Sequence, residues 1–303
     1  MALVPFDDRD GWIWWNGSLV PWRDARPHVL SHGLHYASAV FEGERAYQGN
    51  IFRLRDHTDR LIGSGRILGF EIPWTADQID AACQQVLAAN GLTDGCVRPI
   101  AWRGSEVLGV SPAGTSVHLA IAAWAWPSYY GADRMRGIRV AEAAWKRPSP
   151  ETAPTAAKCT GLHTIGTLSK QRAEDNGYSD ALMLDWRGLV AETTGANVFF
   201  VMDGALHTPT PDGFLDGITR RTVMALARRH QMTVVERPIE AHEIGRTTEV
   251  FLAGTAAEVT AVCEIGPHRY IPGRITETLM RDYDALVGSS PKGSGAEVAR
   301  TLA

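Results

Sequence analysis

Two kinds of hydrophobic period alternate along this chain, and the alternation limits its fold more than any other feature. Short runs with strand-like patterns, such as 97–102 and 117–124, predict strands. The stretch 75–90 instead has apolar residues at helical spacing, namely Ile79, Cys83, Val86 and Leu87. Because both patterns recur along the whole chain, we expect an α/β (mixed α+β) protein rather than a helical bundle.

The expected elements follow from periods and turn signals. Asn16-Gly17 separates two short apolar runs and predicts a strand–turn–strand hairpin over 12–20. Thr75 is the expected N-cap of the helix at 75–90, and Gly91 ends that helix. Further helices are expected at 56–68, 162–176, 218–229 and 275–286. Further strands are expected at 39–47, 138–143, 180–184, 198–202, 233–236 and 250–252.

All periodicity breaks at 127–133, where the sequence is Pro-Ser-Tyr-Tyr-Gly-Ala-Asp. We therefore expect a smaller N-terminal α/β domain at 1–126, a short interdomain loop at 127–137 and a larger C-terminal domain at 138–288. The Gly/Ser-rich residues 289–303 are expected to form a mobile tail.

Composition excludes several classes of function. The formal charge of −4 gives no reason to expect nucleic acid or an anionic membrane as a partner. No apolar run approaches the ~18 residues that span a bilayer, and the acidic N-terminus does not resemble a secretion signal. The four cysteines form no Cys-x-x-Cys pair. We therefore expect a cytoplasmic protein with neither disulfides nor a metal site.

Lys158 is the main candidate for a chemical role. It is one of four lysines in the chain and lies within small, uncharged residues, Pro-Thr-Ala-Ala before it and Cys-Thr-Gly after it. An ammonium group in such surroundings loses hydration, so its pKa falls and the free amine can attack a carbonyl. The pattern indicates a lysine that forms a Schiff base, although an ordinary exposed lysine has the same neighbours in many proteins.

Four further motifs accompany Lys158. They are 35–45 (His-Tyr-Ala-Ser-Ala-Val-Phe-Glu-Gly-Glu-Arg), 191–200 (Ala-Glu-Thr-Thr-Gly-Ala-Asn-Val-Phe-Phe), 215–220 (Leu-Asp-Gly-Ile-Thr-Arg) and 253–259 (Ala-Gly-Thr-Ala-Ala-Glu-Val). In this order and spacing, the set resembles the branched-chain aminotransferases, which are fold-type IV pyridoxal-phosphate enzymes. The resemblance implies pyridoxal 5'-phosphate at the interface of two α/β domains, the C-terminal one binding most of the cofactor.

The resemblance also implies residue roles. Lys158 would form the Schiff base and then carry the substrate proton. Glu192 would keep the pyridine nitrogen protonated, although it could instead be a surface acid beside a turn. Arg60 matches an arginine that pairs with the cofactor phosphate; without the resemblance it would be taken as a solvated helix residue. The other implied cofactor contacts are His163, Thr194, Gly195, Ala196, Asn197, Gly217, Ile218, Thr219, Gly254 and Thr255. Among these, Gly217 opens a predicted helix, whose free N–H groups suit a phosphate.

The implied substrates are amino acids and 2-oxo acids: an L-amino acid with an apolar side chain, and glutamate or 2-oxoglutarate. The residues implied to bind them are Tyr36, Phe41, Gly43, Arg45, Arg98, Thr255, Ala256 and Ala257. Tyr36 would reach across from the partner subunit of a homodimer or higher homo-oligomer. Arg98 would lie near substrate carboxylates, and the turn 255–257 would offer backbone N–H groups to the α-carboxylate. The segment 102–110 matches a mobile loop that closes the pocket.

Two positions depart from the family pattern. His163 and Cys96 each stand where the family commonly has tyrosine. Histidine can still donate a hydrogen bond to the cofactor, but its charge depends on pH. Cysteine removes volume at the pocket wall, so we expect a roomier pocket that accepts bulkier or less typical amino donors.

Other functions remain open. A D-amino-acid or (R)-amine transaminase, or an aminodeoxychorismate lyase, would share this fold, but Pro99-Ile100 after Arg98 lacks the Arg-x-His pair of D-amino-acid enzymes. A non-catalytic relative and a cofactor-free Schiff-base enzyme are further alternatives. The retained Lys158, Glu192 and Arg60 argue against the first of these, and the phosphate-ready helix start against the second.

Overall fold

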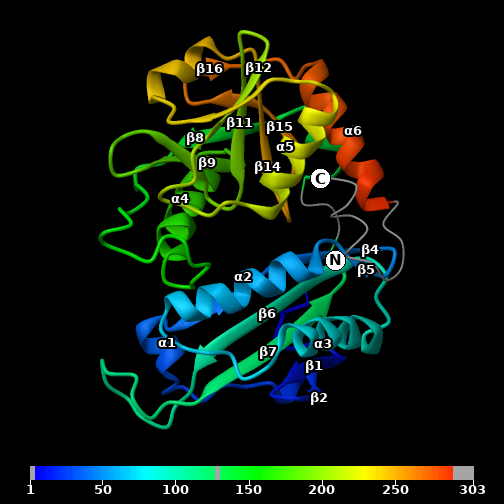
Figure 1. The fold of residues 1–303 in the computed structure, drawn as a ribbon, viewed down its shortest axis with the longest axis vertical. Coiled ribbons are helices and arrows are strands. Elements are labelled where there is room, and N and C mark those ends of the chain that lie inside the picture. Colours follow the sequence, from blue (N-terminus) through cyan, green and yellow to red (C-terminus); the bar gives the residue numbers. More distant parts are fainter. Residues whose placement is uncertain (1–3, 127–129, 289–303) are drawn as a thin grey trace. The chain divides into compact units, whose positions relative to one another are not determined.

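A computed structural model describes residues 4–126 and 130–288, and the chain forms two compact units (Figure 1). The described residues of the first unit are 4–126 and 157–161, and those of the second are 130–156 and 162–288. The short segment with Lys158 thus belongs to the first unit, while its chain neighbours belong to the second. If the chain were divided into two consecutive stretches, residues 157–161 would fall in the second unit. The expected tail at 289–303 lies outside the described residues.

The first unit is built on one sheet. Its strands are β1 (Trp12–Trp15), β2 (Ser18–Pro21), β3 (Ala39–Phe41), β4 (Glu44–Tyr47), β5 (Asn50–Ile51), β6 (Gly95–Arg103) and β7 (Val117–Trp124), and its helices are η1 (Trp22–Asp24), α1 (His32–Tyr36), α2 (Leu54–Ile67) and α3 (Ala76–Ala89). The strand order is β2-β1-β7-β6-β4-β5, with β3 also paired to β6. The predicted hairpin is confirmed: Asn16 and Gly17 both have positive φ, as this tight turn requires.

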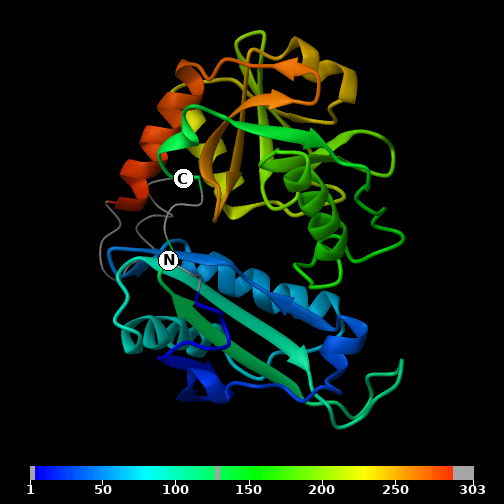
Figure 2. The same ribbon diagram turned by 180° about the vertical axis from the view of Figure 1, so that it is seen from behind.

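Helix α3 covers one face of this sheet (Figure 2), where it packs against β1, β6 and β7. Its start is the predicted one, because Thr75 and Gln78 form a capping box. Its buried residues include Ile79, Cys83 and Val86 from the predicted stripe.

The prediction of a single strand at 39–47 was wrong. Glu42 and Gly43 interrupt this stretch, which therefore forms two strands, β3 and β4. The Glu42 N–H still donates to the Pro99 carbonyl, but its carboxylate turns toward helix α2. Side chains on strand β6 alternate between two faces, and Cys96, Arg98 and Ile100 share the face opposite to buried Val97.

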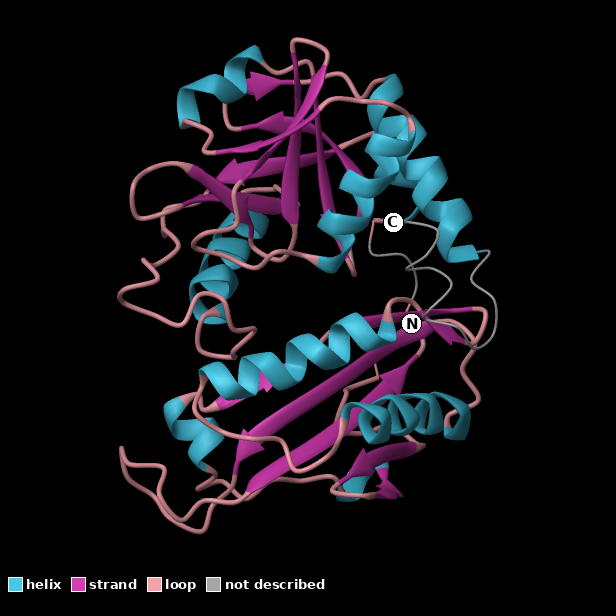
Figure 3. Cartoon of the chain, in the orientation of Figure 1, coloured by secondary structure: helices cyan, strands magenta, loops and turns pink. Residues whose placement is uncertain are grey.

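The second unit also contains one main sheet. Helices and strands both occur in this unit, as expected (Figure 3). Its strands are β8 (Ile138–Glu142), β9 (Asp180–Leu184), β10 (Val190–Thr193), β11 (Asn197–Met202), β12 (Ala205–Pro209), β13 (Val234–Arg237), β14 (Glu249–Gly254), β15 (Glu258–Ile265) and β16 (His268–Arg269), and its helices are η2 (Gly131–Arg134), α4 (His163–Asp175), α5 (Ile218–Arg229), η3 (Ala241–Arg246) and α6 (Arg274–Gly288). The strand order is β10-β9-β8-β15-β14-β11-β12-β13, with β16 on β15.

The core of this unit lies on both faces of the central strands. Val198, Phe200 and Met202 alternate along β11 and pack with residues of β14 and β15 into one cluster. On the opposite face, the Phe199 and Phe251 rings stack with centroids 5.0 Å apart. Helices α5 and α6 pack against each other and against β14.

Four strands of this sheet, β10, β12, β15 and the two-residue β16, were not predicted. Strand β15 is buried on both faces along nearly its whole length, so its sequence has no period-2 alternation to recognise. The other expected helices and strands are present within a few residues of their predicted bounds. The four cysteines are free. Among the described residues, no helix is both long and apolar enough to cross a bilayer.

Candidate functional site

Lys158 is held in the first unit by backbone hydrogen bonds. Its N–H donates to the Ser64 Oγ of helix α2 at 3.0 Å, and its carbonyl accepts from the Phe41 N–H at 3.1 Å. The next residue, Cys159, forms an antiparallel bridge with Val40. The segment therefore extends the edge of β3, and its small neighbours allow this close approach. The side chain is half-buried, as expected for a lysine beside an apolar wall.

Phe41 is the apolar partner of Lys158. The Lys158 Nζ lies 4.8 Å from the centroid of the Phe41 ring, and the Arg98 guanidinium carbon lies 5.0 Å from the same centroid. A cation near an aromatic ring is attracted by the ring quadrupole. The predicted catalytic amine and the predicted carboxylate-binding arginine are thus brought to one aromatic side chain.

Arg60 does not extend into solvent as a lone helix cation. Its Nε and Nη2 donate to the two carboxylate oxygens of Glu42 at 2.6 and 2.8 Å, and the Glu42 Oε2 is also 2.7 Å from the His57 Nδ1. Burial alone would raise the pKa of Glu42, but the charge of Arg60 and the hydrogen bonds from Arg60 and His57 outweigh it and hold that pKa well below its usual range. Burial lowers the pKa of His57, so the ring is neutral and donates through Nδ1.

The remaining substrate candidates of the first unit share one face of the sheet. Arg45 on β4 lies directly opposite Cys96 on β6, and Arg98 follows two residues later on the same face. A Cβ at Gly43 would make ordinary contact with the Arg98 guanidinium, at 3.7 Å from Nη2. Burial raises the pKa of the Cys96 thiol, so it is a neutral part of this wall. Tyr36 is exposed at the end of α1, and its predicted role toward a partner subunit stays a prediction.

Glu192 is positioned in the second unit by two side chains. The Arg147 Nε lies 3.5 Å from its Oε1, and the Asn197 Nδ2 lies 3.5 Å from its Oε2. Arg147 is buried, while the carboxylate on strand β10 is only slightly exposed. The acid is therefore oriented by neighbours rather than solvated at a turn, in agreement with an electrostatic task and not with the surface alternative.

Asn197 connects Glu192 to the start of helix α5. Its Nδ2 also donates to the Leu215 carbonyl at 3.0 Å, and its Oδ1 occupies the space where a Cβ of residue 217 would be. Gly217 is the N-cap of α5, and within residues 4–126 and 130–288 no side chain caps this helix. Among these residues the first N–H groups of α5 thus have no side-chain acceptor, which is the arrangement that suits a phosphate.

Two turns lie beside each other in the same unit. The turn 194–196 joins β10 to β11, and the turn 255–257 joins β14 to β15. A Cβ at Gly254 would be 3.0 Å from the Ala196 Cβ, so glycine is needed for this approach. Thr194 is not free for a ligand through its hydroxyl, because that hydroxyl donates to the Asp180 Oδ1 at 2.6 Å. His163 is the first residue of α4 and half-buried, and its contact with the cofactor stays a prediction.

Sequence reasoning missed several residues that organise the site. Glu42 belongs to the motif 35–45 but had no predicted role of its own. No role at the site was predicted for His57, Ser64 or Arg147. A buried acid in an apolar strand run is a detectable signal, because such an acid requires a cationic partner. The sequence does not say which arginine supplies it.

The fold and these residues place the protein in a known class. Residues 39–265 match the family model for amino-transferase class IV, and the chain belongs to that family. The branched-chain-amino-acid aminotransferase of Pseudomonas aeruginosa is 42% identical over 288 residues, which cover 92% of this chain and 94% of the relative. The expected resemblance and the fold-type IV architecture are therefore confirmed.

Solved structures give the same result. The branched-chain aminotransferase of Thermoproteus uzoniensis, crystallised with norvaline, is 34% identical with a TM-score of 0.89, covering 94% of this chain and 97% of that one. The branched-chain amino acid aminotransferase of Thermobaculum terrenum, in its holo form with PLP, is 32% identical with a TM-score of 0.84, covering 92% and 94%.

Proposed function

We propose that this chain is a pyridoxal-phosphate-dependent branched-chain-amino-acid aminotransferase that exchanges amino groups between apolar L-amino acids and 2-oxoglutarate. The observation that carries the proposal is the position of Lys158. Its amine lies against the Phe41 ring, with a carboxylate-binding candidate, Arg98, against the same ring. An amine and a guanidinium at one apolar wall suit a substrate that has a carboxylate and an apolar side chain.

The residues fit the cofactor that the family uses. When bound, pyridoxal 5'-phosphate supplies an electron sink for the bond that breaks at the substrate Cα. Glu192, held by Arg147 and Asn197, suits the pyridine nitrogen. The uncapped start of α5 at Gly217, Ile218 and Thr219 suits the phosphate, with Thr255 as a further contact. Arg60 is fixed by Glu42, and a fixed guanidinium plane suits a phosphate oxygen.

Lys158 would serve first as the covalent anchor and then as the base at the substrate Cα. The family mechanism requires both tasks of one amine, and backbone hydrogen bonds to Ser64 and Phe41 fix the start of its side chain. A positioned base near the reacting carbon can contribute several kcal/mol through proximity.

The substrate wall supports a finer proposal. Cys96 lies opposite Arg45, where a tyrosine is common in the family, and leaves more room on this face. We infer that the enzyme accepts bulky apolar donors besides valine, leucine and isoleucine. Relative activities on leucine, phenylalanine and a bulky amine test this, with Cys96→Tyr as the matched control. Activity confined to the branched-chain acids would count against the inference.

His163 allows a second finer proposal, that it donates a hydrogen bond to the cofactor. His163→Ala should then change the visible absorption of the holoenzyme and the pH titration of that absorption. An unchanged titration would identify His163 as a packing residue. A homodimer, a contribution of Tyr36 across it and a cytoplasmic location remain parts of the proposal.

One preparation tests the main proposal. The purified protein should be yellow and should bleach on addition of L-valine or L-glutamate but not D-valine. Borohydride should then link the cofactor to the peptide that contains Lys158, and Lys158→Ala should show neither effect. Bleaching by D-valine or an (R)-amine alone would favour the alternative transaminases, and a colourless protein that binds no cofactor would exclude the proposal.

A further inference from the structure

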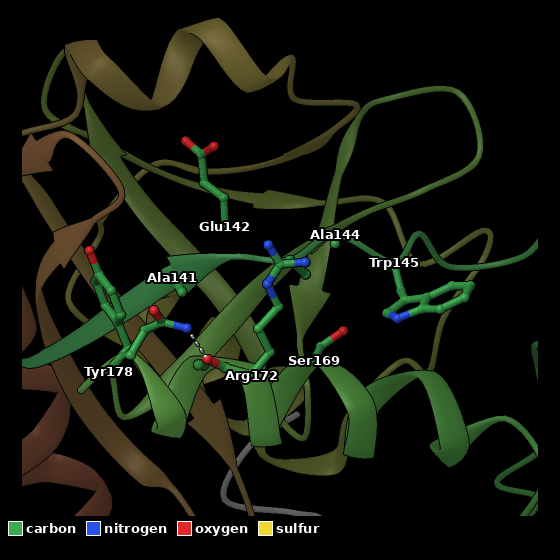
Figure 4. Close-up of a pocket in the computed structure, with 10 residues that line it drawn as sticks. Ala141, Glu142, Ala144, Trp145, Ser169, Arg172 and Tyr178 are labelled. Atoms are coloured by element: carbon green, nitrogen blue, oxygen red, sulfur yellow. Dashed lines mark hydrogen bonds between the residues drawn. The ribbon is translucent and has the colours of Figure 1, made fainter.

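A pocket apart from the proposed catalytic residues lies in the second unit, between helix α4 and the end of strand β8 (Figure 4). Its volume is about 220 Å³, below the roughly 300–1,000 Å³ of sites for drug-sized ligands. The residues that line it are Ala141, Glu142, Ala143, Ala144, Trp145, Ser169, Arg172, Ala173, Asn176 and Tyr178. None of them was assigned a role from the sequence, and the proposed reaction uses none of them.

Ser169 is the first sign that the pocket takes a ligand. The residue is 3% exposed, and its Oγ has no hydrogen-bond partner among the residues that the structure describes. A buried hydroxyl without a partner costs about 1–3 kcal/mol, so such groups in native proteins call for an explanation. Figure 4 shows this hydroxyl rising from α4 toward the pocket, and a ligand oxygen there would satisfy it.

Arg172 is the second sign. It follows Ser169 by three positions and therefore lies on the same side of α4, and Figure 4 shows both side chains extending toward β8. In the described parts of the chain, its guanidinium forms no ion pair. Its backbone carbonyl accepts a hydrogen bond from the Asn176 Nδ2 at 2.7 Å. A planar guanidinium without an acid is suited to bind a carboxylate through two parallel hydrogen bonds.

The rest of the lining limits the kind of ligand. Four alanines and the Trp145 and Tyr178 rings form its apolar part, which suits a short hydrocarbon tail. Glu142 is the one acid among the lining residues, and Figure 4 shows its side chain pointing away from α4. Its charge still disfavours a dianion such as phosphate more than a singly charged acid.

We propose that this pocket binds a small monocarboxylate, with the carboxylate on the Arg172 guanidinium and the Ser169 hydroxyl and the tail against Trp145 and the alanines. The site is separate in its residues from those proposed for catalysis. It would therefore hold a short-chain acid without covalent chemistry.

Binding of 4,4,4-trifluorobutyrate to the enzyme loaded with pyridoxal 5'-phosphate, followed by ¹⁹F NMR, tests the proposal. Besides any binding at the proposed catalytic site, we expect a second saturable event that Arg172→Gln weakens at least about tenfold and Ser169→Ala weakens several-fold, since hydrogen bonds to charged groups are the strong ones. Arg229→Gln, an exposed arginine on α5, is the matched control and should bind as the wild type does. Basal transamination without the probe should be unchanged in all three variants.

Two further measurements make the result decisive. Isobutyrate should displace the probe from this event, whereas equal inorganic phosphate should not; displacement by phosphate alone would overturn the assignment to a monocarboxylate. Ser169→Ala should leave the free energy of unfolding equal or higher, because it removes an unsatisfied group. Binding that is insensitive to both Arg172→Gln and Ser169→Ala, or no binding, would overturn the proposal.

Discussion

Arg60 and Glu42 form a two-pronged ion pair at 2.6 and 2.8 Å, although they are 18 positions apart and neither was expected to contact the other. The Glu42 carboxylate is completely buried, and His57 occupies the remaining direction at 2.7 Å. The pair links the break between strands β3 and β4 to helix α2, which also holds the Lys158 backbone through Ser64. The anchor of the proposed catalytic amine therefore depends on a buried charge network.

Glu42→Gln should destabilise the protein by about 3–5 kcal/mol, because it leaves the half-buried Arg60 without its counter-charge. Urea unfolding followed by circular dichroism measures this. Glu71→Gln is the control, since Glu71 forms an exposed pair with Arg66 at 3.2 Å and should cost less than about 1 kcal/mol. Equal effects of the two substitutions would contradict the proposed role of burial.

Glu44 should make stability depend on pH in the opposite direction to a paired acid. Burial first, and the Glu42 charge second, raise its pKa well above the usual 4.5, and the neighbouring Cys83 thiol offsets this only in part. The folded protein thus keeps a proton that the unfolded chain releases above about pH 4.5, so this group lowers stability as pH rises from there toward its folded pKa.

Replacing Glu44 isolates that effect. Glu44→Gln should remove the downward slope between pH 5 and 8, and Glu44→Leu should in addition raise the free energy of unfolding at pH 8 by about 1–3 kcal/mol. Denaturant unfolding at several pH values measures both. A wild-type slope that persists in Glu44→Gln would show that another group titrates.

Gly217→Ala should weaken cofactor binding. A methyl group there would overlap the Asn197 Oδ1, which is held by the bond from Asn197 to the Leu215 carbonyl, so the start of α5 must shift. We expect at least about a tenfold loss of affinity for pyridoxal 5'-phosphate, since a displacement of the binding groups by about 1 Å can cost that much. Absorbance titration of the apoprotein measures this affinity. Gly63→Ala is the control, because a Cβ there meets nothing within 4 Å, and it should raise stability by about 0.5–1 kcal/mol. Unchanged affinity in Gly217→Ala would contradict the phosphate assignment.

Glu192→Gln should lower kcat about 10²–10³-fold, the cost of removing one positioned electrostatic contact. Arg147 acts through Glu192 at 3.5 Å, so Arg147→Gln should lower kcat less, by about tenfold, and Arg147→Lys should recover part of the loss. Steady-state kinetics with L-valine and 2-oxoglutarate, together with the visible spectrum of each variant, measure this. A change in Michaelis constant alone, with kcat and spectrum intact, would assign both residues to substrate binding.

Much of the local structure could be read in the sequence. Asn16-Gly17 predicted the hairpin because a tight turn needs positive φ at both residues, and Thr75 predicted the start of α3 because its hydroxyl caps the helix. The five motifs indicated the family, and Lys158 stood out through its small neighbours. Strand β15 could not be recognised, because a strand buried on both faces has no alternation.

Other features depend on contacts between distant parts of the chain. The packing of residues 157–161 on β3, the pairing of Arg60 with Glu42, and the convergence of Arg147 and Asn197 on Glu192 join residues that share no periodic pattern. Local signals report the conformation that each residue favours along the chain. The partner of a buried charge or hydroxyl is chosen instead by the packing of strands and helices, because only that packing removes water and brings the two groups within hydrogen-bond distance.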